Sequence, residues 1–232
     1  LSPTLALGLG ASGLTPLELT AAYSVFASQG VRYEPLAVKW VEDAEGQVLE
    51  KHSSLGDRVM SEQQAFVMTT MLQNVVQRGT ATRAKVLQRS VAGKTGTTND
   101  FIDAWFVGYS PNLVAGVWVG IDDYQPLGNK EAGSRAALPI WIEFMQQALE
   151  RVPMQEFVTP PHIRMVRVHP RTGVGGELRS GEGIQIALAE NVAPQGGQVK
   201  ALRNGERPSG VGAGIPTRWR DLGLGDAPPP SD

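Results

Sequence analysis

The sequence predicts an α+β fold in which helices pack against an antiparallel sheet. Two helices with well-defined N-termini are followed by three segments whose apolar residues recur at every second position, 91–98, 104–110 and 113–121. The links between these segments are short, whereas a parallel pair needs a crossover of a dozen or more residues. Neighbouring strands are therefore expected to be antiparallel, and helices beside such a sheet define the α+β class.

The helices are predicted from their first residues. A helix is expected over residues 14–30, where Thr15 and Glu18 have the spacing of a capping box and Pro16 occupies the first helical position. A second helix begins at Ser61, which has Gln64 three residues on. In both cases a side-chain hydroxyl is available for an amide that lacks a partner within the helix.

Three further elements surround the sheet. Residues 31–50 alternate apolar and polar side chains on both sides of residues 43–46, which predicts a β-hairpin. A short helix is expected over 79–87 and a longer one over 136–150. The longer helix carries an apolar stripe formed by Ile140, Trp141, Phe144, Met145 and Leu149.

The sequence also predicts how several glycine and tryptophan residues pack. Glycines within strands permit close approach by a packed helix, and the positions concerned are Gly108, Gly116 and Gly120. Core packing is expected for four tryptophans, Trp40, Trp105, Trp118 and Trp141. Asp103 is expected to serve the structure rather than catalysis.

Composition excludes several classes of function. The 232 residues include 21 basic and 23 acidic side chains, a formal charge of −2 that argues against a nucleic-acid partner. The absence of cysteine excludes disulfides, thiolate nucleophiles and cysteine-based zinc sites. No metal or other cofactor is expected, because the histidines lack metal-ligand spacing; they are His52, His162 and His169.

Domain organisation is predicted from changes in composition and residue pattern along the chain. Residues 1–152 carry the predicted core, and residues 153–195 read as a small β extension with a turn at 169–173. Residues 196–232 are rich in Gly, Pro and charge, so a disordered tail is expected. No apolar run approaches the ~18 residues of a membrane helix. Because the first residue is Leu1, we expect the chain to be part of a longer protein whose anchor is not included.

The most informative segment runs from Gly93 to Thr98 and reads Gly-Lys-Thr-Gly-Thr-Thr. A phosphate-binding P-loop is excluded, because Gln88 stands where that motif needs glycine and the segment leads into a strand. As a strand edge, the same residues suit a ligand carboxylate: lysine supplies charge, threonines supply hydroxyls, and glycine lets a peptide lie against the backbone. Taken alone, the tripeptide Lys-Thr-Gly is short enough to occur by chance.

The surroundings of this segment resemble the transpeptidase domain of class A, bifunctional penicillin-binding proteins, closest to the 1a type. Lys-Thr-Gly belongs to the motif set of penicillin-binding proteins and serine β-lactamases. Further matching strings occur in family order over residues 1–150. They are Leu14-Thr15-Pro16-Leu17-Glu18, Gly79-Thr80-Ala81, Asp103-Ala104-Trp105-Phe106-Val107-Gly108-Tyr109, Val117-Trp118-Val119-Gly120 and Ala137-Leu138-Pro139-Ile140-Trp141.

The resemblance implies a D,D-transpeptidase that cross-links peptidoglycan stem peptides on the periplasmic face of the bacterial inner membrane and is trapped by β-lactams. By motif, Lys94 would bind the substrate carboxylate and support proton transfer, and Thr95 and Thr97 would bind that carboxylate through their hydroxyls. The Thr97 N–H would be one oxyanion donor. Gly96 would keep the strand edge clear. The resemblance thus implies a groove beside Lys94.

One departure from the family pattern is as informative as the match. No Ser-x-x-Lys occurs in the 232 residues, and the string Ser110-Pro111-Asn112 lies after Lys-Thr-Gly, in a predicted turn. We therefore expect that the nucleophile and the N-terminal half of the domain lie outside this chain, that it is inactive alone, and that its sheet has an unpaired edge. Two alternatives remain open: a noncatalytic peptidoglycan-binding module, and a fragment of a serine β-lactamase or D,D-carboxypeptidase.

Overall fold

The computed structural model describes residues 7, 10, 12–128, 130–168 and 183–189. The chain divides into two compact units, Leu1–Ile163 and Arg164–Asp232. Strand β8 (Ile163–Val168) pairs with β9 (Ile184–Ala189), as expected for a short strand pair in this part of the chain. The predicted turn at 169–173 and the predicted tail lie outside the described residues.

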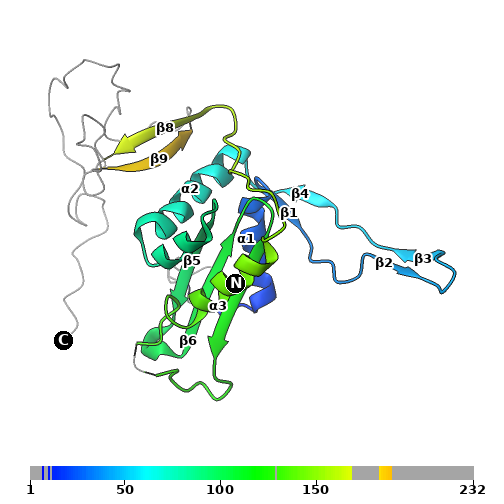
Figure 1. The fold of residues 1–232 in the computed structure, drawn as a ribbon, viewed down its shortest axis with the longest axis horizontal. Helices are drawn as coiled ribbons and strands as arrows, with labels where there is room; N and C mark the ends of the chain where they lie inside the picture. The colour runs from blue at the N-terminus through cyan, green and yellow to red at the C-terminus, as the bar shows by residue number, and fades with distance from the viewer. Residues whose placement is uncertain (1–6, 8–9, 11, 129, 169–182, 190–232) are drawn as a thin grey trace. The chain divides into compact units, whose positions relative to one another are not determined.

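The first unit is built around a three-stranded antiparallel sheet, shown in Figure 1. Its strands are β5 (Ala92–Thr97), β6 (Asp103–Tyr109) and β7 (Val114–Gly120), and they lie in the order β5-β6-β7. A tight turn joins the last two, in which the Ser110 N–H donates to the carbonyl of Leu113 at 2.9 Å. The strands, their order and their antiparallel pairing are as the sequence predicts.

Helices α1 (Pro16–Ala27) and α3 (Ala137–Ala148) cover opposite faces of this sheet. A Cβ built on Gly116 would collide with the Thr20 hydroxyl of α1, and one built on Gly108 would lie 2.8 Å from the Trp141 ring of α3. Gly108 pairs with Ala115, the neighbour of Gly116, so the two glycines face opposite sides. The predicted close approach of helices to strand glycines is confirmed at these two positions.

Two clusters of buried side chains form the core, one on each face of the sheet. On the α3 face, Trp141 is fully buried against Phe106, with ring centroids 4.9 Å apart. On the α1 face, Tyr109 packs with Leu72 and Ala92. Helix α2 (Glu62–Arg78) contributes to both clusters. The sheet is therefore held from both sides, and α2 packs against β5.

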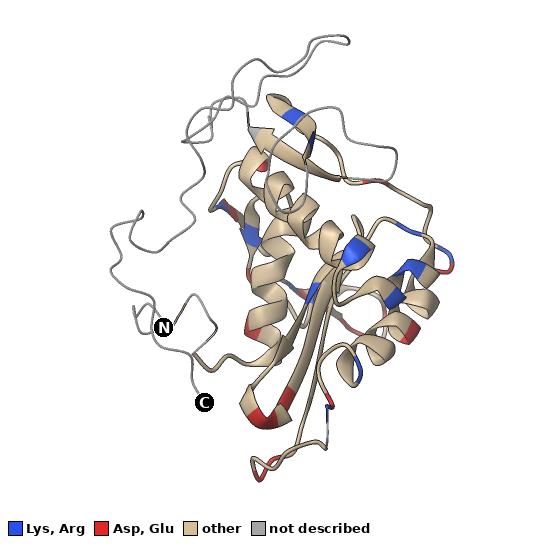
Figure 2. Cartoon of the chain, turned by 90° about the vertical axis from the view of Figure 1, so that its left-hand side faces the viewer, with Lys and Arg blue, Asp and Glu red and all other residues tan. Residues whose placement is uncertain are grey.

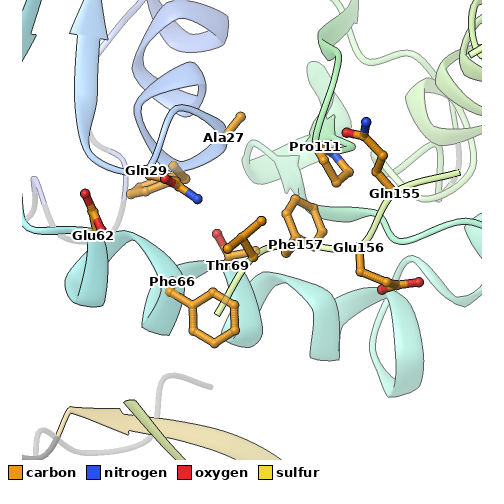
Figure 3. A pocket seen from close by; sticks show the side chains of 11 residues that line it. Ala27, Gln29, Glu62, Phe66, Thr69, Pro111, Gln155, Glu156 and Phe157 are labelled. Atoms are coloured by element: carbon orange, nitrogen blue, oxygen red, sulfur yellow. The ribbon is translucent and has the colours of Figure 1, made fainter. Parts of the chain in front are cut away.

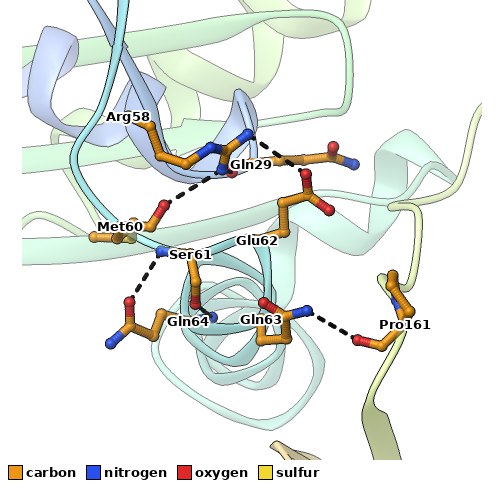
Figure 4. Close-up of polar contacts among 8 residues, drawn as sticks. All are labelled: Gln29, Arg58, Met60, Ser61, Glu62, Gln63, Gln64 and Pro161. Carbon is orange, nitrogen blue, oxygen red and sulfur yellow. Dashed lines mark hydrogen bonds and ion pairs between the residues drawn. The ribbon is translucent and has the colours of Figure 1, made fainter.

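The start of α2 has the predicted capping box (Figure 4). The Gln64 N–H donates to the Ser61 hydroxyl at 3.1 Å, and the Ser61 N–H donates to the Gln64 side-chain oxygen at 3.0 Å. Arg58 donates to the Gln29 carbonyl at 3.0 Å, which ties this helix start to the end of α1. The Thr15–Glu18 capping box at the start of α1 is confirmed as well.

A hairpin extends away from the sheet and its helices (Figure 1). Strands β2 (Trp40–Glu42) and β3 (Val48–Lys51) pair around the predicted turn, where the Asp43 carboxylate accepts the Gln47 N–H at 2.8 Å. The prediction of one hairpin over residues 31–50 is wrong for its first strand. Strand β1 (Val31–Tyr33) pairs with β4 (Gly56–Arg58), which lies beyond the predicted hairpin.

Two short helices complete the first unit. Helix η2 (Thr82–Leu87) is a 3₁₀ helix at the predicted place, and η3 (Asn99–Phe101) lies between β5 and β6.

The structure corrects several predictions about single side chains. The prediction of core packing is wrong for Trp40, which is 53% exposed on the hairpin, and for Trp118, which is 38% exposed. Ile140 and Phe144 of the predicted stripe are about half exposed, and Gly120 approaches the Trp118 ring rather than a helix.

Candidate active-site strand

The Lys-Thr-Gly-Thr segment occupies an edge strand of the sheet. Strand β5 pairs with β6 on one side only, so within the described residues its second edge carries no strand partner. The chain reverses sharply after it: the Thr98 N–H donates to the Asp103 carbonyl at 3.1 Å, and the Thr98 hydroxyl accepts the Asp103 N–H at 2.7 Å. An edge strand with free backbone groups is the setting in which an extended peptide can bind as an added strand.

Successive side chains of β5 point to opposite faces. Lys94 is exposed, and its Nζ donates to the Thr95 carbonyl at 2.8 Å. Gly96 lies opposite Trp105, and a Cβ built on Gly96 would lie 3.0 Å from the Cβ of Trp105. The segment thus presents the lysine on one face of the strand and the two threonine hydroxyls on the other.

Both threonine hydroxyls have a polar partner from another part of the chain. The Thr95 Oγ1 lies 2.7 Å from the Thr80 Oγ1, in the loop between α2 and η2. The Thr97 Oγ1 accepts the Gly133 N–H at 3.1 Å. The geometry therefore brings together two of the expected carboxylate-binding residues and fixes each by a hydrogen bond.

Glycine is required at position 133 by this contact. A Cβ at Gly133 would collide with the carbonyl oxygens of Trp105 and Gly96, so only an unsubstituted residue can approach the strand this closely. Sequence reasoning missed both Gly133 and Thr80 as site residues. The string Gly79-Thr80-Ala81 offered a signal for Thr80, but Gly133 lies in no motif that could have marked it.

Asp103, at the start of β6, has the structural role that was expected. Its carboxylate accepts the Trp118 indole N–H at 2.8 Å, and the Trp105 and Trp118 rings lie with centroids 6.3 Å apart. The aspartate thereby fixes the orientation of a partly exposed indole on the same face as Lys94.

A cavity among the described residues lies away from β5 (Figure 3). It has a volume of about 160 Å³ and lies between the end of α1, the first half of α2 and residues 155–158. Aromatic rings of Phe26, Phe66 and Phe157 line it, together with the Thr69 side chain. Neither this cavity nor a second one along α3 is lined by a residue of β5, so the groove expected beside Lys94 stays a prediction.

The charge distribution is mixed. Basic and acidic residues are interspersed over the described part of the chain in the view of Figure 2, in keeping with the formal charge of −2. No group of three or more potential metal-binding side chains occurs among the residues that the structure describes. Within that same part, no helix has the length and apolar character needed to cross a membrane.

An α+β unit whose edge strand reads Lys-Thr-Gly-Thr defines the broad class that includes penicillin-binding proteins and serine β-lactamases. Comparison with protein families narrows this class: the penicillin-binding protein transpeptidase domain matches residues 2–146. The chain belongs to this family.

Relatives and solved structures agree with this assignment. Penicillin-binding protein 1A of Aquifex aeolicus is 44% identical over 194 residues, which cover 84% of this chain and 27% of that protein. The corresponding protein of Pseudomonas aeruginosa is 35% identical over 218 residues, with 72% of this chain and 26% of the relative covered. The chain thus spans about a quarter of the length of these relatives.

The fold comparison supports the predicted class. The crystal structure of penicillin-binding protein 1A from Haemophilus influenzae has a TM-score of 0.74 and 28% identity, and the match covers 82% of this chain and 34% of that one. A penicillin-binding protein of Mycobacterium tuberculosis gives a TM-score of 0.58 and 29% identity over 68% of this chain and 44% of that one. The α+β prediction and the resemblance to 1a-type proteins are both confirmed.

Proposed function

We propose that this chain supplies the Lys-Thr-Gly side of a D,D-transpeptidase site that cross-links peptidoglycan stem peptides. The observation that carries the proposal is the pair of hydroxyls, Thr95 and Thr97, on one face of an edge strand, with Lys94 on the other face and its Nζ on the Thr95 carbonyl. A peptide terminating in a carboxylate could lie along this edge, with its charge attracted by Lys94 and its oxygens hydrogen-bonded by the threonines.

The reaction divides into two acyl-transfer steps. A serine attacks the carbonyl of the terminal D-Ala–D-Ala bond, forming an ester and releasing D-alanine, and an amine of a neighbouring stem peptide then displaces the serine. The Thr97 N–H would donate to the carbonyl oxygen while it carries negative charge, and Gly96 keeps the edge accessible. Because the 232 residues contain no Ser-x-x-Lys, this proposal takes the attacking serine to come from outside them.

Within the whole protein, the proposed setting is a bifunctional glycosyltransferase and transpeptidase at the periplasmic face of the bacterial inner membrane. Glycan strands carrying stem peptides would be the substrates. β-Lactams, which mimic the D-Ala–D-Ala terminus, would acylate the same serine. The family assignment and the relatives of the 1A type support this proposal.

Binding of a model stem terminus tests the proposal on the chain itself. We expect N-acetyl-D-alanyl-D-alanine to shift the amide NMR signals of residues 94–97, and the same dipeptide with a C-terminal amide to bind much more weakly. The double variant Thr95→Val, Thr97→Val should lose this binding, while Thr159→Val, at an exposed position, should retain it. Equal binding of acid and amide, or signal shifts confined to other regions, would contradict the proposal.

Labelled penicillin provides the matching covalent test. The 232-residue chain should form no covalent adduct, because a ligand carboxylate can bind without a nucleophile but an acyl-enzyme cannot form. A labelled band on a denaturing gel would show that some other residue of this chain attacks the β-lactam.

The lack of Ser-x-x-Lys also favours a second candidate, a noncatalytic module that binds D-Ala–D-Ala termini. The two candidates predict the same binding by this chain. They differ in the gene: a Ser-x-x-Lys encoded upstream of Leu1 supports the transpeptidase, and a reading frame without one supports the binding module.

A further inference from the structure

Two polar groups outside β5 approach the hydroxyls of the Lys-Thr-Gly-Thr segment. The Gly133 N–H donates to Thr97, and the Thr80 hydroxyl lies 2.7 Å from that of Thr95. The two contacts lie on the same face of the strand, because positions 95 and 97 are two residues apart. Each threonine of the proposed carboxylate site is therefore hydrogen-bonded to a residue of a different loop.

The number of available hydrogens decides what these contacts can do. A hydroxyl has one hydrogen to donate and two lone pairs with which to accept. A backbone N–H only donates, so its bond to Thr97 occupies a lone pair and leaves the Thr97 hydrogen free. An anionic ligand needs such free hydrogens, because a carboxylate accepts hydrogen bonds and offers none.

The Thr80–Thr95 pair can be arranged in two ways, since either oxygen could be the donor. If Thr95 donates to Thr80, its only hydrogen is used and it cannot bind a carboxylate. If Thr80 donates, Thr95 matches Thr97, with a lone pair occupied and the hydrogen free. A negative charge beside Thr95 favours the second arrangement, because hydrogen bonds to charged acceptors are about twice as strong as neutral ones.

The core fixes the backbone around Thr80. The Gly79 N–H donates to the Val75 carbonyl at 3.0 Å, and the Ala81 N–H donates to the same oxygen at 3.2 Å. Ala81 is fully buried in the cluster that contains Trp141 and Phe106, while Thr80 itself is exposed. The loop is therefore held by its neighbours, and the Thr80 side chain is free to serve the edge strand.

We propose that Thr80 is a positioning residue for the carboxylate of a peptide terminus. Its hydroxyl donates to Thr95, so that Thr95 and Thr97 both direct their hydrogens at one anionic group. The arrangement also strengthens the bond to the ligand, because hydrogen bonds in a chain polarise one another. This inference rests on the proposed function, since it assigns Thr80 a role at that same site.

The test compares Thr80→Val with Thr80→Ser in the 232-residue chain, with N-acetyl-D-alanyl-D-alanine as the probe. Valine has nearly the shape of threonine but no hydroxyl, and it should weaken binding about fivefold, the effect of one hydrogen bond of ordinary strength. Serine restores the donor and should restore the affinity. Thermal unfolding of each variant, followed in parallel, separates loss of binding from loss of folding.

A double-mutant cycle tests the route through Thr95. In a Thr95→Val background, Thr80→Val should have no further effect on affinity. Equal affinity of the wild type and Thr80→Val, or a full effect of Thr80→Val in the Thr95→Val background, overturns the role of Thr80 and leaves the proposed function standing. Absence of binding by the wild-type chain overturns the proposed function and with it the role of Thr80.

Discussion

The hydroxyl of Thr69 on α2 lies 2.9 Å from the hydroxyl of Tyr109 on β6, and both side chains are buried. The Thr69 hydroxyl also donates to the Ala65 carbonyl oxygen at 2.9 Å, within its own helix. This pair is a polar link between the helix and the sheet on the α1 face of the core. It joins α2, which leads directly into the loop of Thr80, to β6, the strand that pairs with β5.

Removal of the Tyr109 hydroxyl should therefore lower the stability of the chain. We expect Tyr109→Phe to reduce the free energy of unfolding by about 1 kcal/mol, the net value of one buried hydrogen bond. Chemical denaturation at neutral pH measures the change. Tyr124→Phe, at a position 79% exposed, is the matched control and should have no effect. An unchanged stability of Tyr109→Phe would show that the Thr69–Tyr109 bond contributes nothing.

The same tyrosine predicts a loss of stability at alkaline pH. Burial raises the pKa of Tyr109 well above its ordinary value, and burial raises the pKa of Tyr23 in the same direction. A raised pKa in the folded state means that the proton is held more tightly there than in the unfolded chain. The stabilisation that results is fully present below pH ~10, the pKa of tyrosine in the unfolded chain, and it decreases as the pH rises above that value.

Unfolding curves measured from pH 8 to 11 test this dependence. The wild type should lose stability above pH ~10, and Tyr109→Phe should lose less, with the remaining slope due to Tyr23. Identical slopes for the two proteins would exclude Tyr109 as the source.

Close packing of α3 on the sheet makes Gly108 sensitive to substitution. A Cβ at this position would lie 2.8 Å from the Trp141 ring, 2.8 Å from the Phe106 ring and 3.0 Å from the Ala92 carbonyl oxygen. We expect Gly108→Ala to destabilise the fold by about 1–3 kcal/mol through overpacking. Gly13→Ala, where a Cβ would meet no atom within 4 Å, is the control, and equal stabilities of the two variants would refute the packing argument.

The parts of the fold that sequence predicts are those set by local chemistry. Thr15 and Ser61 mark their helix starts because a hydroxyl three residues before Glu or Gln satisfies free amides, whatever the rest of the chain does. The period of two in residues 91–121 likewise fixes three strands, and their short links fix the pairing.

What the sequence does not predict depends on residues that meet only in space. Thr80 and Thr95 are 15 positions apart, and Gly133 and Thr97 are 36 apart, so no periodicity relates them. The exposure of Trp40 has a similar cause: alternation predicts a strand, but only the fold determines whether another layer covers it. The Lys-Thr-Gly-Thr segment was thus predictable as a motif, and its contacts with Thr80 and Gly133 were not.

The edges of the sheet predict self-association of the chain. Among the described residues, β5 and β7 each pair with β6 alone, which leaves one edge of each strand without a strand partner. Unpaired edges offer rows of free N–H and C=O groups to a second chain. We expect the weight-average sedimentation coefficient to rise with protein concentration. Leu49→Lys, on the exposed hairpin, distinguishes the cause: association through the sheet edges should persist in this variant, whereas association through the apolar hairpin should decrease. A single monomeric species at all concentrations would mean that both edges are protected in solution.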